Sequence, residues 1–265
     1  MQKTFSQSLK EAVLTPLSAD FHTHTCYCDG AHSPEEMVLS AIEKGLTTLG
    51  IVTHSPMPFY ESYTIAEEKI AAFQAELNAL KQKYADKITL YCGMEKDAYS
   101  TTPIAGFDYV IGSAHYLRKE GDFCAVDISL QGFTDGVNRM FGGDFYAAAE
   151  NYYSSLSTVV QQTNADIIGH FDLITKFNEK YNLFDTDNPR YVRAWQAAAD
   201  ALLKTGKPFE VNTGAIARGW RTAPYPATEM IAYIKARGAK FVFSSDGHNK
   251  DNIAYHYTEI KDILR

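Results

Sequence analysis

The sequence is short of positive charge. It contains 25 Lys and Arg residues against 32 Asp and Glu, which gives a formal net charge of −7 at pH 7. Proteins that bind long nucleic acids through the phosphate backbone usually present a basic face. We therefore expect no nucleic-acid partner, although this count takes no account of positive charge that bound metal ions would add.

Long apolar runs are also missing. No stretch approaches the roughly 20 residues needed to span a bilayer, and the N-terminal residues lack the apolar segment of a secretory signal. Only four cysteines occur among 265 residues, which does not suggest a disulfide framework in a chain of this length. These absences predict a reduced, cytoplasmic protein without a membrane segment. Nothing in the sequence indicates an oligomeric state.

Linkers, low-complexity segments and internal repeats are absent as well, so residues 1–265 are expected to form one domain. Short apolar runs recur along the chain, and several lack the alternation of half-exposed strands. Because helical patterns fall between them, the order predicts an α/β fold with a parallel sheet closed as a barrel. Residues 121–145, rich in Gly and Asp, are expected to be irregular, either as an active-site loop or as a long excursion. The predicted strands are 18–22, 48–53, 88–94, 109–113, 166–170, 208–212 and 241–245, and the predicted helices are 34–42, 65–84, 190–205 and 227–237.

Histidines stand where these predicted strands end. Six of the eight histidines in the chain follow five of the apolar runs, and acidic residues accompany them. One histidine at a strand end is more often a structural residue than a ligand. Six are harder to explain by packing, because each buried imidazole would need its own hydrogen-bond partner. Histidines and carboxylates gathered at one edge of a barrel indicate a polynuclear metal site.

The spacing within two of these clusters supports that interpretation. His22 and His24 are two residues apart, so on a strand both imidazoles point to one face and can reach one ion. Asp246 and His248 repeat this spacing, and closure of a barrel would bring the first and last strands together. Glu95, at the end of the third predicted strand, is the best candidate for a carboxylate that bridges two ions.

These ordered clusters resemble the polymerase and histidinol phosphatase (PHP) family of metal-dependent phosphoesterases. The resemblance covers almost the whole chain. It implies a distorted (β/α)7 TIM-like barrel with three divalent metal ions (Zn, Mn or Fe) at the C-terminal ends of its strands. The residues that carry the resemblance are Asp20–Thr25, Thr53–Ser55, Glu95, Gly112–His115, Gly169–His170 and Ser245–His248.

The resemblance also divides the ligands among three ions. Many family members carry histidine at the position of Asp29, and a carboxylate there should favour a harder metal. Glu95, Asp246 and His248 are expected to be catalytic as well as ligating. The implied ligands are His22, His24, Glu95 and Asp246 for the first ion, Glu95, His115 and His170 for the second, and Asp29, His54 and His248 for the third.

Further segments resemble the histidinol-phosphate phosphatase branch of the family. That resemblance implies hydrolysis of L-histidinol phosphate to L-histidinol and phosphate, a step of histidine biosynthesis. A small-molecule phosphate ester is therefore the expected substrate. The segments are Thr53–Pro58, Gly169–Lys176, Glu210–Gly214 and Trp220–Pro226.

The charge of the implied site suggests a mechanism. Three divalent cations and three anionic ligands leave a surplus of about +3, which matches a phosphate monoester dianion together with a hydroxide. Water bound to such ions ionises near pH 7. The hypothesis is in-line attack on phosphorus by hydroxide that bridges two metals. The donor of a proton to the leaving alkoxide stays open, and a metal-bound water is one candidate.

Residues that bind the substrate are harder to choose. Arg218 and Arg221 follow the sixth predicted strand and are candidates to hold phosphate bidentately, the alternative being that both are solvent-facing loop residues. Lys176 is a weaker candidate for the same role. A loop after His54 would overhang the site, so its polar and aromatic residues are candidates for the imidazole or ammonium end. These are Phe59, Tyr60, Glu61 and Tyr63.

Other functions fit parts of this pattern. A PHP-type phosphoesterase could act on another small phosphate ester or a nucleotide. An amidohydrolase-like enzyme usually needs a carboxylated lysine at a strand end, and the sequence has no clear candidate. A non-catalytic metal-binding module is also an alternative, but such a protein would have no reason to retain every metal ligand of a hydrolytic site.

Overall fold

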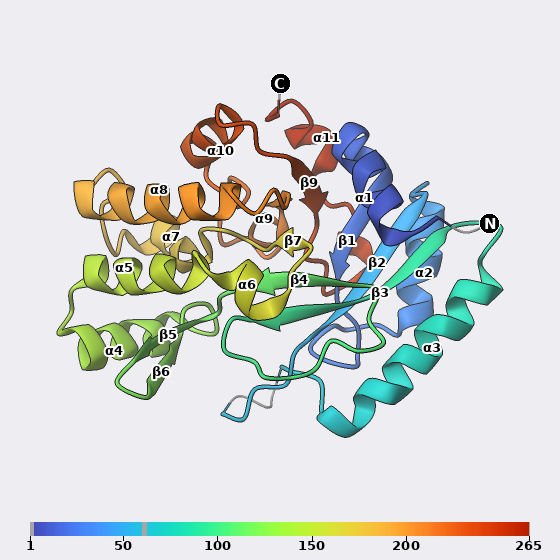
Figure 1. Cartoon of the computed structure of the whole chain (residues 1–265), viewed down its shortest axis with the longest axis horizontal. Helices are drawn as coiled ribbons and strands as arrows, with labels where there is room; N and C mark the ends of the chain where they lie inside the picture. Colours follow the sequence, from blue (N-terminus) through green and yellow to red (C-terminus); the bar gives the residue numbers. More distant parts are fainter. Residues whose placement is uncertain (1–2, 60–62, 265) are drawn as a thin grey trace.

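A parallel sheet of seven strands forms the centre of the molecule, with helices outside it (Figure 1). The computed structural model describes residues 3–59 and 63–264. In the described chain each strand of this sheet pairs in parallel with the next, in the order β1-β2-β3-β4-β7-β8-β9. Hence the predicted α/β barrel is confirmed. Its strands are β1 (Ala19–Thr23), β2 (Thr48–His54), β3 (Thr89–Asp97), β4 (Tyr109–Ser113), β7 (Ile167–Ile168), β8 (Phe209–Asn212) and β9 (Phe241–Ser244).

The barrel is nearly closed between β1 and β9. Within the described residues, one isolated parallel bridge joins Thr23 of β1 to Gly247, in the turn after β9. The amide of His24 donates to the carbonyl of Gly247 at 2.8 Å, and the amide of Gly247 donates to the carbonyl of His22 at 3.1 Å. Since both sides of this closure carry predicted metal ligands, the contacts that close the barrel also assemble the candidate site.

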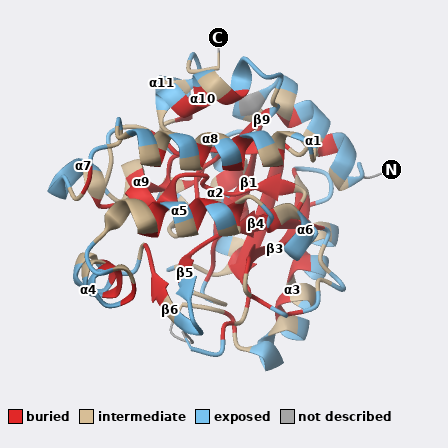
Figure 2. Cartoon of the chain, turned by 60° about the vertical axis from the view of Figure 1, so that its left-hand side comes forward, coloured by how far each residue is buried: buried red, intermediate tan, exposed pale blue. Residues whose placement is uncertain are grey.

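Helices cover the outside of the sheet, whose strands are buried along nearly their whole length (Figure 2). Ser33 caps α2 with a reciprocal capping box to Glu36, and Pro34 occupies the first turn, as the sequence predicts. No helix in the described part of the chain is long and apolar enough to cross a membrane. The helices are α1 (Phe5–Leu14), α2 (Pro34–Glu43), α3 (Ile70–Lys83), α4 (Leu130–Phe141), α5 (Phe145–Leu156), α6 (Val159–Thr163), α7 (Asn178–Tyr181), α8 (Pro189–Leu203), α9 (Gly214–Ala217), α10 (Thr228–Lys235) and α11 (Tyr257–Ile260).

The prediction that residues 121–145 are irregular was wrong. Strands β5 (Tyr116–Lys119) and β6 (Asp122–Ala125) form an antiparallel hairpin, and α4 follows it. Glu120 and Gly121 both have positive φ, which suits a tight hairpin turn. Helix α4 is amphipathic and buries apolar side chains such as Phe133. Gly121, Gly142 and Asp144 stand in the hairpin turn and at helix ends, and the helix and the hairpin between them replace the expected loop.

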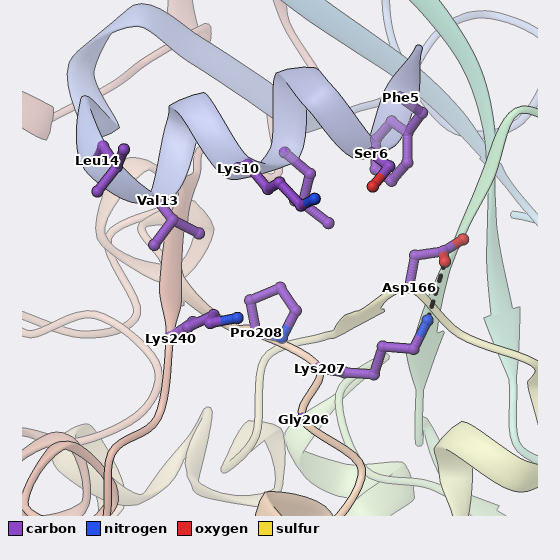
Figure 3. Close-up of a pocket in the computed structure, with 11 residues that line it drawn as sticks. Phe5, Ser6, Lys10, Val13, Leu14, Asp166, Gly206, Lys207, Pro208 and Lys240 are labelled. Atoms are coloured by element: carbon purple, nitrogen blue, oxygen red, sulfur yellow. Dashed lines mark hydrogen bonds and ion pairs between the residues drawn. The ribbon is translucent and has the colours of Figure 1, made fainter.

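At the end of the barrel opposite the strand C-termini, α1 covers a cavity of about 390 Å³ (Figure 3). Its walls include Phe5, Leu9 and Val13 of α1. Lys207 and Asp166 form an ion pair there at 3.1 Å. None of the histidines in the described chain lines this cavity, so the predicted metal chemistry belongs to the other end.

The interior of the barrel depends on two glycines. Tyr109 is buried, and its hydroxyl donates to the carbonyl of Phe21. Its ring lies against Gly50 of β2 and Gly93 of β3, where an added Cβ would overlap the phenol. The absence of a side chain at these positions therefore makes room for the large ring on β4.

We expect Gly93→Ala to destabilise the protein by about 1–3 kcal/mol, because the new methyl group overpacks the barrel against Tyr109. Urea unfolding followed by circular dichroism measures this loss. The double variant Gly93→Ala, Tyr109→Leu should recover part of it, since the shorter side chain makes room for the methyl group. A single variant as stable as the wild type would contradict this account of the packing.

Candidate metal centre

All nine predicted metal ligands lie together at the C-terminal ends of the strands. A cavity of about 320 Å³ opens there, and seven of the nine line it. His22 and His24 lie beneath the others and are fully buried. Strand pairing contributes directly, because the register of β2 and β3 sets His54 opposite Glu95. The seven residues that line the cavity are Asp29, His54, Glu95, His115, His170, Asp246 and His248.

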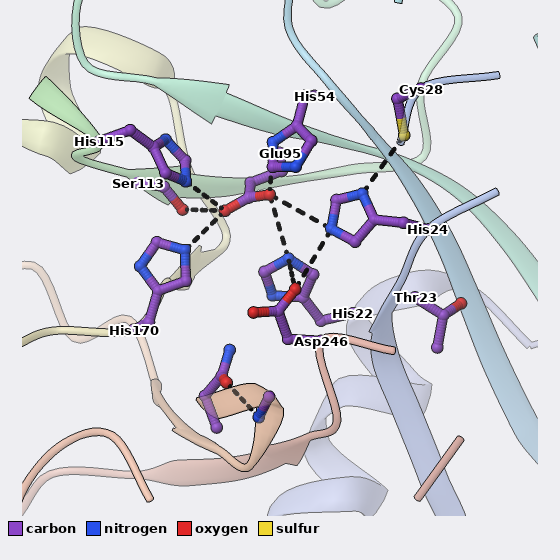
Figure 4. Close-up of polar contacts among 12 residues, drawn as sticks. His22, Thr23, His24, Cys28, His54, Glu95, Ser113, His115, His170 and Asp246 are labelled. Atoms are coloured by element: carbon purple, nitrogen blue, oxygen red, sulfur yellow. Dashed lines mark hydrogen bonds and ion pairs between the residues drawn. The ribbon is translucent and has the colours of Figure 1, made fainter. Parts of the chain in front are cut away.

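The carboxylate of Glu95 stands at the centre of this arrangement (Figure 4). Its Oε2 atom lies 3.2 Å from His22 Nε2 and 3.4 Å from His24 Nε2. Asp246 Oδ1 is 3.6 Å and 3.5 Å from the same two nitrogens. As the spacing predicts, the two imidazoles of the first motif face one point.

The other oxygen of Glu95 faces a second pair of histidines. Glu95 Oε1 lies 3.2 Å from His115 Nε2 and 2.8 Å from His170 Nε2. The hydroxyl of Ser113 donates to the same oxygen at 2.8 Å and so helps to orient the carboxylate. Glu95 therefore has separate histidine partners on its two oxygens, which is the geometry expected of a bridging ligand.

A third group forms around Asp29. His54 Nε2 is 3.6 Å from Asp29 Oδ1, and His248 Nε2 is 3.2 Å from Asp29 Oδ2. Donor atoms of these three residues and of His24 lie within 4.8 Å of one another. His54 also reaches the centre, because its Nδ1 is 2.9 Å from Glu95 Oε2.

Metal ions fit this set of donors. The buried atoms His22 Nε2, His24 Nε2 and Glu95 Oε2 have no hydrogen-bond partner although they converge. Buried polar atoms without a partner are costly, and a cation between them would remove that cost. Mixed imidazole and carboxylate donors suit Zn, Mn or Fe. How the individual side chains are divided among ions stays a prediction.

Two of the candidate ligands, His24 and Glu95, have the protonation states that metal binding needs. Burial, together with the nearby His248 and His54 rings, lowers the pKa of His24 to about 4, so this imidazole is neutral. Burial raises the pKa of Glu95, but the charges of His22, His54 and other histidines outweigh it and hold that pKa well below its ordinary value. A neutral imidazole and an ionised carboxylate are both able to donate to a cation.

The strand argument for Asp246 and His248 needs a correction. Strand β9 ends at Ser244, and Asp246 has a φ of 50°, in the left-handed region. The two residues therefore lie in a turn, not on one face of a strand. They nevertheless converge, with His248 Nδ1 3.5 Å from Asp246 Oδ1, because the turn folds back over the end of the barrel.

Two buried carboxylates behind the ligands were missed by the sequence analysis. Glu210 Oε1 is 2.6 Å from His22 Nδ1, and Asp97 Oδ2 is 3.2 Å from His115 Nδ1. Each is an acidic residue within or beside an apolar strand run, a signal that could have marked them because unpaired acids are rarely buried. Their charges also reduce the positive surplus counted from the ligands alone.

Of the three basic residues predicted to bind phosphate, two line the cavity. Arg218 Nη2 is 2.9 Å from Asp246 Oδ2, and its guanidinium Nε is buried without a hydrogen-bond partner. Lys176 donates to the carbonyl of Asp127 at 2.6 Å. Both present positive charge to the cavity that contains the candidate ligands.

Arg221 is placed elsewhere. Its Nη1 atom pairs with Asp172 Oδ2 at 3.0 Å and donates to the hydroxyl of Thr175 at 2.7 Å. Its guanidinium lies over the ring of Tyr225, 4.4 Å from the centroid. The side chain does not line the cavity of the candidate ligands, so its surroundings indicate a structural ion pair.

The loop after His54 is described in part. Tyr63 lines the cavity, and its ring centroid lies 5.0 Å from that of His54. Phe59 instead stacks on Phe123 of the β5–β6 hairpin, at 4.3 Å between centroids. Tyr60 and Glu61 lie outside the described residues.

The conserved pattern of the PHP domain matches residues 20–214. This chain belongs to the PHP domain family. Of the nine strands in the described residues, the match includes β2–β8 and all but the first residue of β1, and it includes all of the candidate ligands apart from Asp246 and His248. The expected extent of the domain over residues 1–265 stays a prediction.

Known proteins of similar sequence and structure extend this finding. A probable histidinol-phosphatase of Deinococcus radiodurans is 29% identical over 92% of this chain and 93% of its own length. The assigned histidinol phosphatase hisK of Listeria monocytogenes superimposes with a TM-score of 0.81 at 22% identity, over 91% of this chain and 99% of that one. Histidinol phosphate phosphatase of Lactococcus lactis, solved with zinc, L-histidinol and phosphate, has a TM-score of 0.69 at 20% identity over 93% of each chain. The two structures share the fold of this PHP domain.

We expect Glu95→Gln to weaken zinc binding at least about 100-fold, because the change removes a ligand rather than an outer partner. Zinc content after dialysis, measured by mass spectrometry, checks this result. Glu43→Gln, an exposed position in α2, is the matched control and should bind zinc as the wild type does. Equal zinc content in both variants would rule out Glu95 as a bridge.

Arg221→Met should lower the free energy of unfolding by about 3–5 kcal/mol, because it leaves the carboxylate of Asp172 buried without its partner. Thermal or urea unfolding measures the loss. A variant of unchanged stability with a greatly raised KM for a phosphate ester would instead assign Arg221 to the substrate.

Proposed function

We propose that this PHP-domain protein is a metal-dependent histidinol phosphatase, which hydrolyses L-histidinol phosphate to L-histidinol and phosphate. The observation that carries the proposal is the convergence of imidazole and carboxylate donors on both oxygens of Glu95. The similarity to histidinol-phosphatases over nearly the whole chain supports the choice of substrate.

We also propose that three divalent ions bind, one in each of the donor groups around Glu95 and Asp29. Such ions, when bound, would polarise a phosphate ester and lower the pKa of a coordinated water enough for attack near neutral pH. The groups found in the structure contain enough histidines and carboxylates for this number.

The chain itself would hold the substrate through charge and shape. Arg218 and Lys176 line the cavity and would donate to phosphate oxygens. Ile128 and Leu173 add apolar surface to the same walls. Asp127 lies among them and is the cavity's carboxylate closest to Lys176, at 3.6 Å.

Asp246 is not the group that donates a proton to the leaving alkoxide in the proposed reaction. Asp246 is engaged by Arg218, and although burial raises the pKa of Asp246, the adjacent guanidinium and His22 hold it well below its usual range. Its carboxylate is therefore ionised and does not carry a proton for the leaving alkoxide. Asp246 instead acts as a ligand and a positioning group.

The substrate assignment is tested by comparing rates on several phosphate esters with the zinc-loaded, manganese-loaded and iron-loaded protein. We expect kcat/KM for L-histidinol phosphate to exceed that for an aryl phosphate, a nucleoside monophosphate and a phosphodiester by at least about 100-fold. Similar kcat/KM values for all of these esters would indicate a less selective PHP phosphoesterase. Absence of turnover with all three metals would leave a metal-binding module.

A further inference from the structure

Glu210 is a buried acidic residue that the proposed reaction does not use directly. It lies in β8 and is 1% exposed. It belongs to none of the donor groups around Glu95 and Asp29. Burying a carboxylate costs several kcal/mol unless it is fully hydrogen-bonded, so its contacts should reveal what it does.

The two oxygens of Glu210 serve different partners. Oε1 lies 2.6 Å from Nδ1 of His22. Oε2 accepts the backbone amide of His170 at 2.9 Å and the side-chain amide of Asn212 at 3.2 Å. One carboxylate thus joins β8 to two candidate ligands that belong to β1 and to the end of β7.

The contact with His22 decides which of its nitrogens can bind a cation. An ionised carboxylate only accepts hydrogen bonds, so His22 Nδ1 must carry a proton toward Glu210. The lone pair of a neutral ring is then on Nε2, which points at Glu95 Oε2 and Asp246 Oδ1. A histidine ligand commonly gives its other N–H to such an acceptor, which orients the ring.

The contact with His170 acts on the other side of the centre. His170 follows the two-residue strand β7, which provides little ladder pairing of its own. The bond from its backbone amide to Glu210 holds this segment where His170 Nε2 lies 2.8 Å from Glu95 Oε1. Glu210 is therefore connected to both oxygens of the central carboxylate through different histidines.

We propose that Glu210 is a positioning residue that sets the tautomer of His22 and the place of His170, and so organises two neighbouring metal positions from one carboxylate. Asp97 differs, because it bonds the ring and the backbone amide of a single histidine, His115. Loss of Glu210 should therefore affect cation binding on both sides of Glu95. This inference rests on the metal-binding part of the proposed function.

The variant Glu210→Gln tests the proposal with little change in volume. An amide has one accepting oxygen and one donating nitrogen, so it cannot accept from both His22 and His170. We expect zinc affinity, measured by competition with a chromophoric chelator, to fall about 10–100-fold. At saturating zinc we expect kcat for the best substrate to fall more than KM changes.

Val211→Ala is the matched control on the same strand. Val211 is fully buried and belongs to the apolar core rather than to the site. This variant should lower the unfolding temperature but leave zinc affinity within about two-fold of the wild type. Equal losses of affinity in both variants, or none in Glu210→Gln, would overturn the positioning role.

Nitrogen NMR of the zinc-loaded wild-type protein provides a test that does not depend on whether a variant folds. The expected spectrum shows His22 with a hydrogen-bonded proton on Nδ1 and zinc on Nε2. Zinc on Nδ1, or an unprotonated Nδ1, would overturn the proposal. Because the zinc affinity and the NMR spectrum report on zinc and not on turnover, a failure of the histidinol phosphatase assignment would be seen separately.

Discussion

The carboxylate of Glu95 is the interaction on which the site depends. Its two oxygens face different histidines, and the donors around them come from β1, from the end of β2 and from the segments that follow β4 and β7. A carboxylate at this depth is stable only while cations or protonated imidazoles surround it. The barrel must therefore place four strand ends around one side chain, and the parallel pairing of β1, β2, β3, β4 and β7 contributes to this.

The hydrogen bonds that close the barrel also position residues of the candidate site. The bonds between His22, His24 and Gly247 join the first and last strands while they position the residues of the first motif. Farther inside, Tyr109 fills the space above Gly50 and Gly93. A packed interior beneath the site gives the ligands a rigid base, which a catalytic metal centre needs in order to hold its geometry.

The periodicity of the sequence predicted much of this arrangement. All seven barrel strands were found within a few residues of their expected positions. Uninterrupted apolar runs that alternate with helical patterns are typical of parallel strands buried on both faces. The histidines at their ends converge because parallel strands all end on one side. The hairpin and α4 within residues 121–145 were missed, because Gly and Asp mark turns and helix ends as readily as loops.

The sequence by itself determined which residue types stand at the strand ends, because that follows from the local apolar runs and from the spacing of the residues after them. Only the tertiary structure decided what each of these side chains meets. His22 and Glu210 are 188 residues apart, and no local pattern relates them. Likewise the pairing of Arg221 with Asp172 and the turn that brings Asp246 toward His22 depend on how distant segments pack. Local sequence preferences specify the helices and strands. The partner of each buried charged side chain depends instead on the closed barrel, because every buried charge must find a hydrogen-bond or ion-pair partner there.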